Sequence, residues 1–227
     1  MEKNAIIYGQ EFEYCFIEDK GYLELEVFKG PRLNPLSFDF SSQLYHHQQM
    51  NYSKHKEPLA KAMGFAKNPN PHIIDLTLGS AGDALILLSM GARVTGIEMN
   101  PVIFRLLENA LERAQMSKEQ SVKEMSSHLT IVHDHSMDFL EQTDETFDVA
   151  YLDPMFELSE KKSLPPKKMQ IMRDLISHTP FFDAKIICLA KEHGVRRVVI
   201  KRPLKGKELF PGVVGTVKGK TVRYDIY

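Results

Sequence analysis

The chain has 227 residues, of which 43% are hydrophobic and 26% charged, a balance typical of one large folded domain or of a domain with a small appendage. This composition excludes a fibrous or low-complexity chain. No apolar run approaches the ~18 residues of a membrane span, and residues 1–8 lack the long apolar region of a signal peptide. Cys15 and Cys188 have no metal-ligand spacing. We therefore expect a cytoplasmic protein with reduced thiols, no metal site and no membrane partner.

Charge is unevenly distributed along the chain, although the formal net charge is only −1. Residues 1–160 contain 13 basic and 25 acidic residues, a net charge of −12, whereas residues 161–227 contain 16 basic and 5 acidic residues, a net charge of +11. Clustered Lys and Arg gain affinity for polyanions because they release counterions from phosphates. The asymmetry favours a nucleic-acid partner, and a solvated basic surface is the alternative.

The first 70 residues predict a small β-rich region. Short apolar alternations at 22–28 and 36–40 are separated by Gly-Pro and Asn-Pro turns. Residues 57–66 predict a connecting helix, and two successive Asn-Pro pairs at 68–71 break the chain. We therefore expect a boundary here, between an N-terminal region at 1–70 and a main domain at 71–227.

Strands and helices alternate from residue 71 onward. We expect strands at 72–76, 93–97, 129–133, 147–152 and 195–200, and helices at 81–90, 101–116, 137–141, 168–177 and 183–191. The tail, 212–217 and 221–227, predicts a closing antiparallel hairpin. Repeated βα units of this length predict an α/β, Rossmann-like fold whose ligand crevice lies at the carboxyl ends of the parallel strands.

The first two strand ends favour a nucleoside cofactor. Asp75 is followed by Gly79 and Gly82, where the backbone can turn closely around a ligand before Asp83 and the helix. Glu98 ends the second strand 19 residues after Gly79, the spacing at which a carboxylate reaches ribose hydroxyls. The turn reads GxxG instead of GxGxxG, which weakens the alternative of an NAD-binding oxidoreductase without excluding it.

The third and fourth strand ends add polar groups. At 133–136, backbone amides and short polar side chains can face an adenine ring. After the fourth strand, the Asp153 carboxylate and the Pro154 carbonyl can accept hydrogen bonds from an exocyclic amine, and Phe156 offers a stacking face. This set suits a flat base that carries an NH2 group, and an ordinary β-turn with a core Phe is the alternative.

Four segments together resemble the RsmJ family, formerly the YhiQ family: 75–79, 97–101, 151–156 and 199–203. The resemblance runs from about Lys54 to Tyr227. It implies an S-adenosylmethionine-dependent methyltransferase that acts on the N2 amine of a guanine in bacterial 16S ribosomal RNA, free or in the small ribosomal subunit. The cofactor contacts, from the resemblance and from the strand ends, fall on Asp75, Gly79, Gly82, Asp83, Glu98, Met99, His135, Ser136 and Asp153.

The chain departs from the family pattern at several positions. The family's glycine turn reads Gly-x-Gly-Arg-Asp, whereas this chain has Gly-Ser-Ala-Gly-Asp at 79–83, so an arginine contact is missing. His135 stands where serine is common, and Glu157 stands where many relatives have proline. A basic glycine-rich stretch is replaced by 48–54. We therefore expect the cofactor and RNA contacts to differ in these places.

Methyl transfer from a sulfonium needs neither a metal nor a covalent nucleophile, because the methyl group is already electrophilic. The catalytic candidates are therefore Asp153, Pro154 and Phe156, which place the amine. The basic candidates for phosphate contacts are Lys161, Lys162, Lys167, Lys168, Lys201 and Arg202. An adenine-N6 methyltransferase, an NAD-binding oxidoreductase and a noncatalytic RNA-binding factor are the alternatives, and the oligomeric state is left open.

Overall fold

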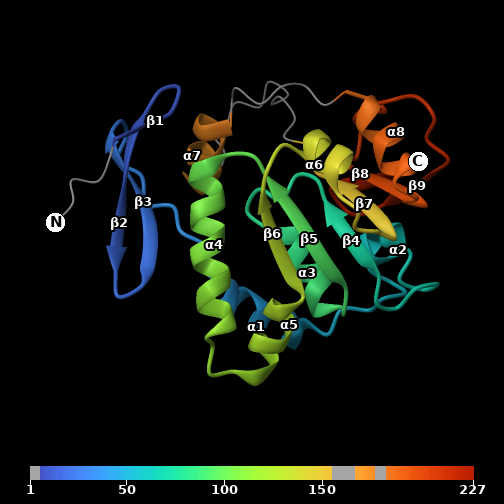
Figure 1. Ribbon diagram of the computed structural model, residues 1–227, viewed down its shortest axis with the longest axis horizontal. Helices are drawn as coiled ribbons and strands as arrows, with labels where there is room; N and C mark the ends of the chain where they lie inside the picture. Colours follow the sequence, from blue (N-terminus) through green and yellow to red (C-terminus); the bar gives the residue numbers. More distant parts are fainter. Residues whose placement is uncertain (1–5, 155–166, 177–182) are drawn as a thin grey trace.

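The computed structural model describes residues 6–154, 167–176 and 183–227, and these form two β-sheets (Figure 1). The small sheet is antiparallel and contains β1 (Ile7–Tyr8), β2 (Glu13–Asp19) and β3 (Tyr22–Lys29). The large sheet has the order β6-β5-β4-β7-β8-β10-β9. Its strands are β4 (His72–Asp75), β5 (Arg93–Glu98), β6 (Leu129–His133), β7 (Val149–Leu152), β8 (Arg197–Pro203), β9 (Gly215–Lys218) and β10 (Val222–Ile226).

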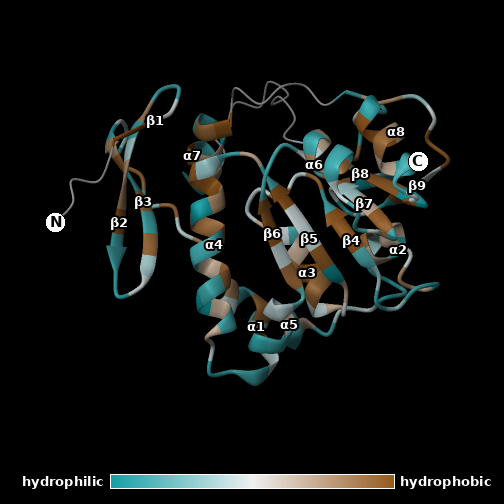
Figure 2. Cartoon of the chain, in the orientation of Figure 1, coloured by the Kyte–Doolittle hydropathy of each residue, from teal (hydrophilic) through white to brown (hydrophobic). Residues whose placement is uncertain are grey.

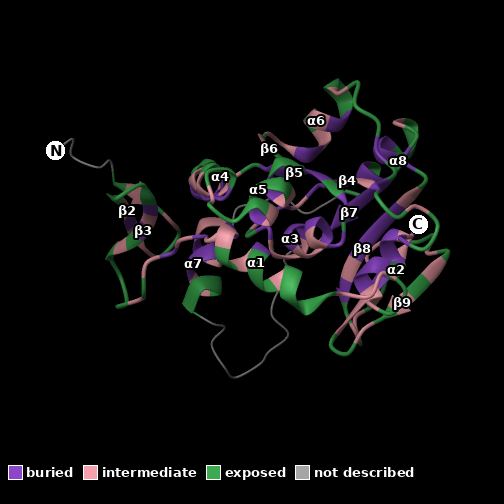
Figure 3. Ribbon diagram, turned by 90° about the horizontal axis from the view of Figure 1, so that it is seen from below, coloured by how far each residue is buried: buried purple, intermediate pink, exposed green. Residues whose placement is uncertain are grey.

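Helices cover both faces of the large sheet, as the view from below shows (Figure 3). On one face lie α6 (Ser136–Gln142) and α8 (Lys185–Glu192). The other face carries α1 (Phe40–Met50), α2 (Pro58–Met63), α3 (Gly82–Ser89), α4 (Pro101–Gln115), α5 (Gln120–Ser127) and α7 (Lys167–Ile176). Two buried apolar clusters, one on each face, therefore hold the layers together.

The local sequence explains the main elements. The strands β4, β5 and β7 are buried except at the first residues of β4 and β5, and apolar residues lie at their centres, as is typical of parallel strands covered on both faces (Figure 2). The helix α4 begins at Pro101, where proline costs no hydrogen bond, and the Asn100 side chain caps it by accepting from the N–H groups of Val102 and Ile103. The predicted βα alternation is thus confirmed in kind and order.

The sheet order brings the expected strand ends together. β4 pairs in parallel with β5 on one side and with β7 on the other, and β8 extends the sheet beyond β7. The chain runs from β4 to β5 and β6 on one side of β4, and then crosses to β7 and β8 on the other side. The carboxyl end of β4 is therefore the topological switch point, where ligands bind in open α/β sheets. The antiparallel β9–β10 hairpin completes the edge, as predicted.

Some elements before β6 differ from expectation. The alternation at 36–40 is wrong as a strand, because Leu36 forms only a single bridge with Leu25 and α1 begins at Phe40. Asp39 caps this helix and accepts a hydrogen bond from the Ser42 N–H over 3.1 Å. The helices α1 and α5 were not predicted, and the boundary at residue 70 stays a prediction.

The small sheet stands beside α4 and α7 at one end of the molecule (Figure 1). The carboxylate of Asp174 on α7 accepts hydrogen bonds from the Tyr14 hydroxyl and the Glu11 N–H, each over 2.7 Å. On α4, the Asn109 side chain bonds to the backbone of Gly21 and Leu23. The small sheet is therefore anchored to the two helices by polar contacts as well as by apolar packing.

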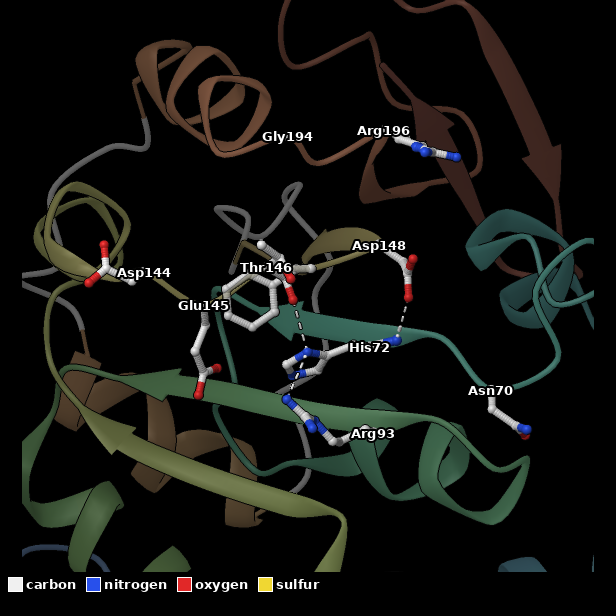
Figure 4. A pocket seen from close by; sticks show the side chains of 10 residues that line it. Asn70, His72, Arg93, Asp144, Glu145, Thr146, Asp148, Gly194 and Arg196 are labelled. Carbon is white, nitrogen blue, oxygen red and sulfur yellow. Dashed lines mark hydrogen bonds between the residues drawn. The ribbon is translucent and has the colours of Figure 1, made fainter.

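A hollow of about 780 Å³ lies at the amino-terminal ends of the parallel strands, on the edge of the large sheet opposite to the switch point (Figure 4). His72 and Arg93, which begin β4 and β5, line it together with Asp148, and the His72 N–H donates to the Asp148 carboxylate over 2.8 Å. It is therefore separate from the strand ends at the switch point. Within the described ranges, no helix combines the length and apolar character that crossing a membrane demands.

Candidate active site

The glycine turn that follows β4 has two residues in the left-handed region. Gly79 has a φ of 52°, and Ala81 has a φ of 60° just before α3 begins at Gly82. The Ala81 N–H closes the turn by donating to the Leu78 carbonyl over 2.8 Å. Ala81 occupies the place of the second glycine of the family pattern, and its backbone conformation explains why glycine suits that place.

Glu98, at the end of β5, is joined directly to this turn. Its Oε2 accepts from the Gly79 N–H over 3.1 Å, and its Oε1 accepts from the Asn100 N–H over 2.7 Å. The side chain is buried, and burial raises the pKa of Glu98 to about 7, although these backbone hydrogen bonds act in the opposite direction. Each carboxylate oxygen has further acceptor capacity, so the group can also receive hydroxyl protons.

Asp75 lies beneath the turn and is almost fully buried. It accepts a hydrogen bond from the Thr77 N–H over 3.0 Å. Burial raises the pKa of Asp75 to about 7; the Thr77 N–H opposes the rise, and the negative charges of Asp83 and Asp153 add to it. Asp75 therefore shapes the turn and adds charge below it.

The predicted residues after β5 and β6 lie as follows. The Met99 side chain is 40% exposed beside the end of β5, and its carbonyl accepts a hydrogen bond from the His133 ring. Ser136 begins α6 and is buried, with its hydroxyl bonded to the Leu76 carbonyl. His135 is the residue before that helix. Met99 thus offers an exposed apolar surface, whereas Ser136 ties α6 to the end of β4.

Asp153, directly after β7, is held from two sides. Its N–H donates to the Thr77 hydroxyl over 2.6 Å, and its Oδ2 lies 2.9 Å from Nζ of Lys201 on β8. The same Nζ lies 2.7 Å from Oδ2 of Asp83, which also accepts from the Tyr151 hydroxyl. One ammonium group therefore connects the first turn of α3 with the end of β7.

The charges in this group oppose one another. Burial raises the pKa of Asp153, the Lys201 ammonium lowers it, and the Asp83 carboxylate raises it further. Burial by itself would lower the pKa of Lys201, but Asp83 and Asp153 together raise it well above its ordinary value. Lys201 therefore stays positively charged, and it is the cation that faces these carboxylates in the part of the chain that the structure describes.

The basic candidates are divided by the structure. Lys201 is turned inward to the two carboxylates, and the Arg202 guanidinium is buried and donates to the Lys207 carbonyl over 3.1 and 2.8 Å. Lys167 and Lys168 are exposed on α7. Lys161, Lys162 and Phe156 lie outside the described residues, as does Glu157. Pro154 is buried.

Sequence reasoning missed three contributors to this site. Thr77 and Tyr151 make hydrogen bonds to Asp153 and Asp83, and Lys201 was assigned to phosphate instead of to carboxylates. The signal for Lys201 was its place directly after three buried apolar residues of β8, 198–200, which favours an inward charge with partners. In the described ranges, no group of three or more His, Cys, Asp and Glu side chains is arranged to hold a metal ion.

Comparison with known proteins agrees with this geometry. The whole chain, residues 1–227, matches a family model described as "Putative SAM-dependent methyltransferase". A Bdellovibrio bacteriovorus protein named ribosomal RNA small subunit methyltransferase J is 35% identical over 221 residues, which cover 96% of this chain and 82% of that protein. Proteins of the same name from Shewanella sediminis and Coxiella burnetii are 32% and 34% identical and cover 98% and 96% of this chain, and 86% and 84% of their own lengths are matched.

A solved structure shows the same fold. The crystal structure of a SAM-dependent methyltransferase from Neisseria gonorrhoeae superposes with a TM-score of 0.71 and covers 97% of this chain and 84% of that one. Its sequence identity of 22% limits this comparison to the fold. The Rossmann-like α/β class predicted from the strand and helix pattern is thus confirmed.

Proposed function

The chain belongs to the ribosomal RNA small subunit methyltransferase J family of SAM-dependent methyltransferases, and on that premise we propose that it methylates the exocyclic N2 amine of a guanine in bacterial small-subunit ribosomal RNA. The family membership supports a methyltransferase over an NAD-binding oxidoreductase, the rival considered from the glycine turn. The relatives' name supports a ribosomal RNA substrate and, with it, a place of action in the bacterial cytoplasm.

The residues around the switch point fit S-adenosylmethionine, which supplies an electrophilic methyl group on a sulfonium. Glu98 offers a carboxylate to the ribose hydroxyls, since each of its oxygens has acceptor capacity beyond the Gly79 and Asn100 N–H groups. The left-handed backbone at Gly79 and Ala81 lets the chain approach a ligand closely before the N-terminus of α3. Met99 offers an apolar contact to the adenine ring.

The observation that carries the proposal is the position of Asp153. Thr77 fixes its backbone to the end of β4, next to the glycine turn, while Lys201 holds its carboxylate. A carboxylate held there accepts hydrogen bonds from an NH2 group, together with the Pro154 carbonyl. Two such bonds turn the nitrogen lone pair toward the methyl donor, and near-attack geometry of this kind is worth ~7–11 kcal/mol in favourable cases.

An exposed basic edge supports RNA as the substrate. Lys205 and Lys207 follow β8, and Lys218 and Lys220 flank the turn between β9 and β10; all four are exposed. The Leu204 N–H donates to the Thr221 carbonyl, which joins the two segments at the carboxyl end of β8. We call these four lysines the lysine edge. Because Asp153 follows the neighbouring strand β7, phosphates on this edge would hold RNA on the same side of the sheet as the site.

Mapping of methyl groups tests the proposal. Ribosomal RNA from cells with and without the gene is digested and analysed by mass spectrometry, and small subunits from the deletion strain are incubated with the purified protein and labelled S-adenosylmethionine. We expect one N2-methylguanosine to be absent from the deletion strain and restored in vitro. A missing N6-methyladenosine instead would establish the adenine alternative, and unchanged RNA together with no labelling would reject the proposal.

A further inference from the structure

We propose that Lys201 is a positioning residue for methyl transfer, because its ammonium group bridges Asp83 on α3 and Asp153 after β7 and so fixes the orientation of the Asp153 carboxylate toward the target amine. This inference rests on the proposed function and assigns a role to a residue that the sequence pattern alone places among the phosphate contacts. The two N–O distances of 2.7 and 2.9 Å are those of charge-assisted hydrogen bonds.

The geometry favours an inward role over a phosphate contact. The Lys201 side chain is 22% exposed, and its two carboxylate partners are 20% and 38% exposed. Asp83 in the first turn of α3 and Asp153, held through Thr77, take two of the three ammonium donors. Their negative charges repel a phosphate at the third donor. Exposed lysines without such partners lie nearby on the lysine edge.

The charges that face Asp153 explain what the bridge does. Among the described residues, they are Asp75 from β4, Asp83 from α3, Tyr151 from β7, Lys201 from β8 and Tyr224 from β10. Lys201 is the cation in this set, and the three aspartates repel one another. Removing the ammonium takes away the charge that lowers the pKa of Asp153 and leaves the Asp83 charge that raises it, so we expect this pKa to rise and the carboxylate to lose its fixed orientation.

The bridge also sets the distance between the glycine turn and Asp153. Asp83 lies at the start of the helix that follows the glycine turn, whereas Asp153 belongs to the substrate side of the site. A single Nζ bonded to both carboxylates therefore keeps the cofactor turn and the amine acceptor in one fixed arrangement. Lys201→Arg keeps a cation that can bond to both carboxylates, whereas Lys201→Met keeps the length of the side chain without the charge.

Single-turnover methyl transfer at saturating cofactor and RNA tests the role in Lys201→Met, Lys201→Gln and Lys201→Arg. Lys185→Met is the matched control, since Lys185 pairs with Glu141 on exposed helices elsewhere. Across about pH 6 to 9, we expect both neutral variants to be at least ~10-fold slower at neutral pH, with the acid limb of the rate profile moved to higher pH. Lys201→Arg should restore most of the rate, and the control should match the wild type.

Two further measurements keep the outcomes distinct. If the salt dependence of RNA binding falls by ~0.7–0.9 in Lys201→Met, the residue is a phosphate contact and the inference is wrong. Carbon NMR titration of the Asp153 carboxyl group needs no activity, and an equal pKa in the wild type and Lys201→Gln would also overturn the bridge. A wild-type protein that methylates no RNA would instead defeat the proposed function, while the titration would still decide the role of Lys201.

Discussion

The backbone N–H of Gly79 donates to Oε2 of Glu98 over 3.1 Å, so the turn after β4 and the end of β5 form one hydrogen-bonded unit. The bond spans 19 residues of sequence, the separation from which a ribose contact was predicted. The carboxylate therefore supports the turn.

Replacement of Glu98 by Ala should weaken S-adenosylmethionine binding by roughly 1.5–3 kcal/mol, the range for hydrogen bonds to a charged group. Isothermal titration calorimetry measures this, with Glu108→Ala on the outer side of α4 as the control. Equal affinity in a folded Glu98→Ala protein would remove Glu98 from the ribose role.

Cofactor affinity should also depend on pH through the same group. Burial raises the pKa of Glu98 to about 7, and ribose hydroxyls donate to the ionised form, so binding below pH 7 must release the proton. Affinity should be full above pH 7 and fall about tenfold per unit as the pH drops further, because one pKa unit corresponds to ~1.36 kcal/mol. The affinity of Glu98→Gln, whose side chain does not ionise, should not fall in this way when it is titrated at several pH values. An identical fall below pH 7 in both proteins would assign the pH dependence to another group.

The acceptor role of Asp153 predicts a loss of rate and not of RNA binding. Asp153→Ala should lower single-turnover methyl transfer on the order of 100-fold, since misplacement at the reacting atom has this effect. RNA affinity should change little because phosphate contacts supply most of it. Rapid-quench kinetics and filter binding measure the two quantities, and methyl transfer at the wild-type rate would show that the amine is bound elsewhere.

The lysine edge predicts a change in the salt dependence of RNA binding. Replacing Lys205, Lys207, Lys218 and Lys220 by Gln should weaken RNA binding and reduce the slope of log K against log salt by ~0.7–0.9 for each phosphate that the protein no longer neutralises. A Lys167→Gln, Lys168→Gln protein measures the contribution of α7, and Lys29→Gln on the small sheet is the control. An unchanged slope in the fourfold variant would make the edge a solvated face.

The small sheet should contribute to stability through Tyr14. Its hydroxyl donates to the buried Asp174 carboxylate over 2.7 Å, so Tyr14→Phe should lower the free energy of unfolding by about 1.5–3 kcal/mol. Tyr8→Phe is the matched control, because the Tyr8 side chain is 73% exposed. Urea denaturation gives both values, and equal midpoints would show that the hydrogen bond adds no stability.

The site residues that could be located from the sequence are those that directly follow a predicted strand. The strand ends at Asp75, Glu98 and Asp153 follow from the βα alternation, because parallel strands bring their carboxyl ends to one edge. The helix at Phe40 was mistaken for a strand because five residues fit an alternating pattern while the capping signal of Asp39 was overlooked. The polar helix α5 has only Val122 and Ser126 buried, which is a weak apolar pattern.

The role of Lys201 could not be located in the same way. A strand pattern shows that the residue lies in the sheet, but its partners Asp83 and Asp153 are 118 and 48 residues away. Which acid meets which base depends on the order of the strands in space. Charge counts along the chain therefore pointed to a polyanion, whereas this particular lysine bonds to the protein's own acids.

The excess of carboxylates around that lysine has a consequence for turnover. Among the described residues, Asp83 and Asp153 bond to the Lys201 ammonium, and the charges of both acids act on Asp75. Even with Asp75 half-protonated near pH 7, these four groups are negative on balance. The cofactor carries a positive sulfonium before the reaction and a neutral thioether after it, so Coulomb attraction to these acids disappears as the methyl group leaves. The acids that we propose to place the amine would thereby also favour the exchange of spent cofactor for a fresh molecule.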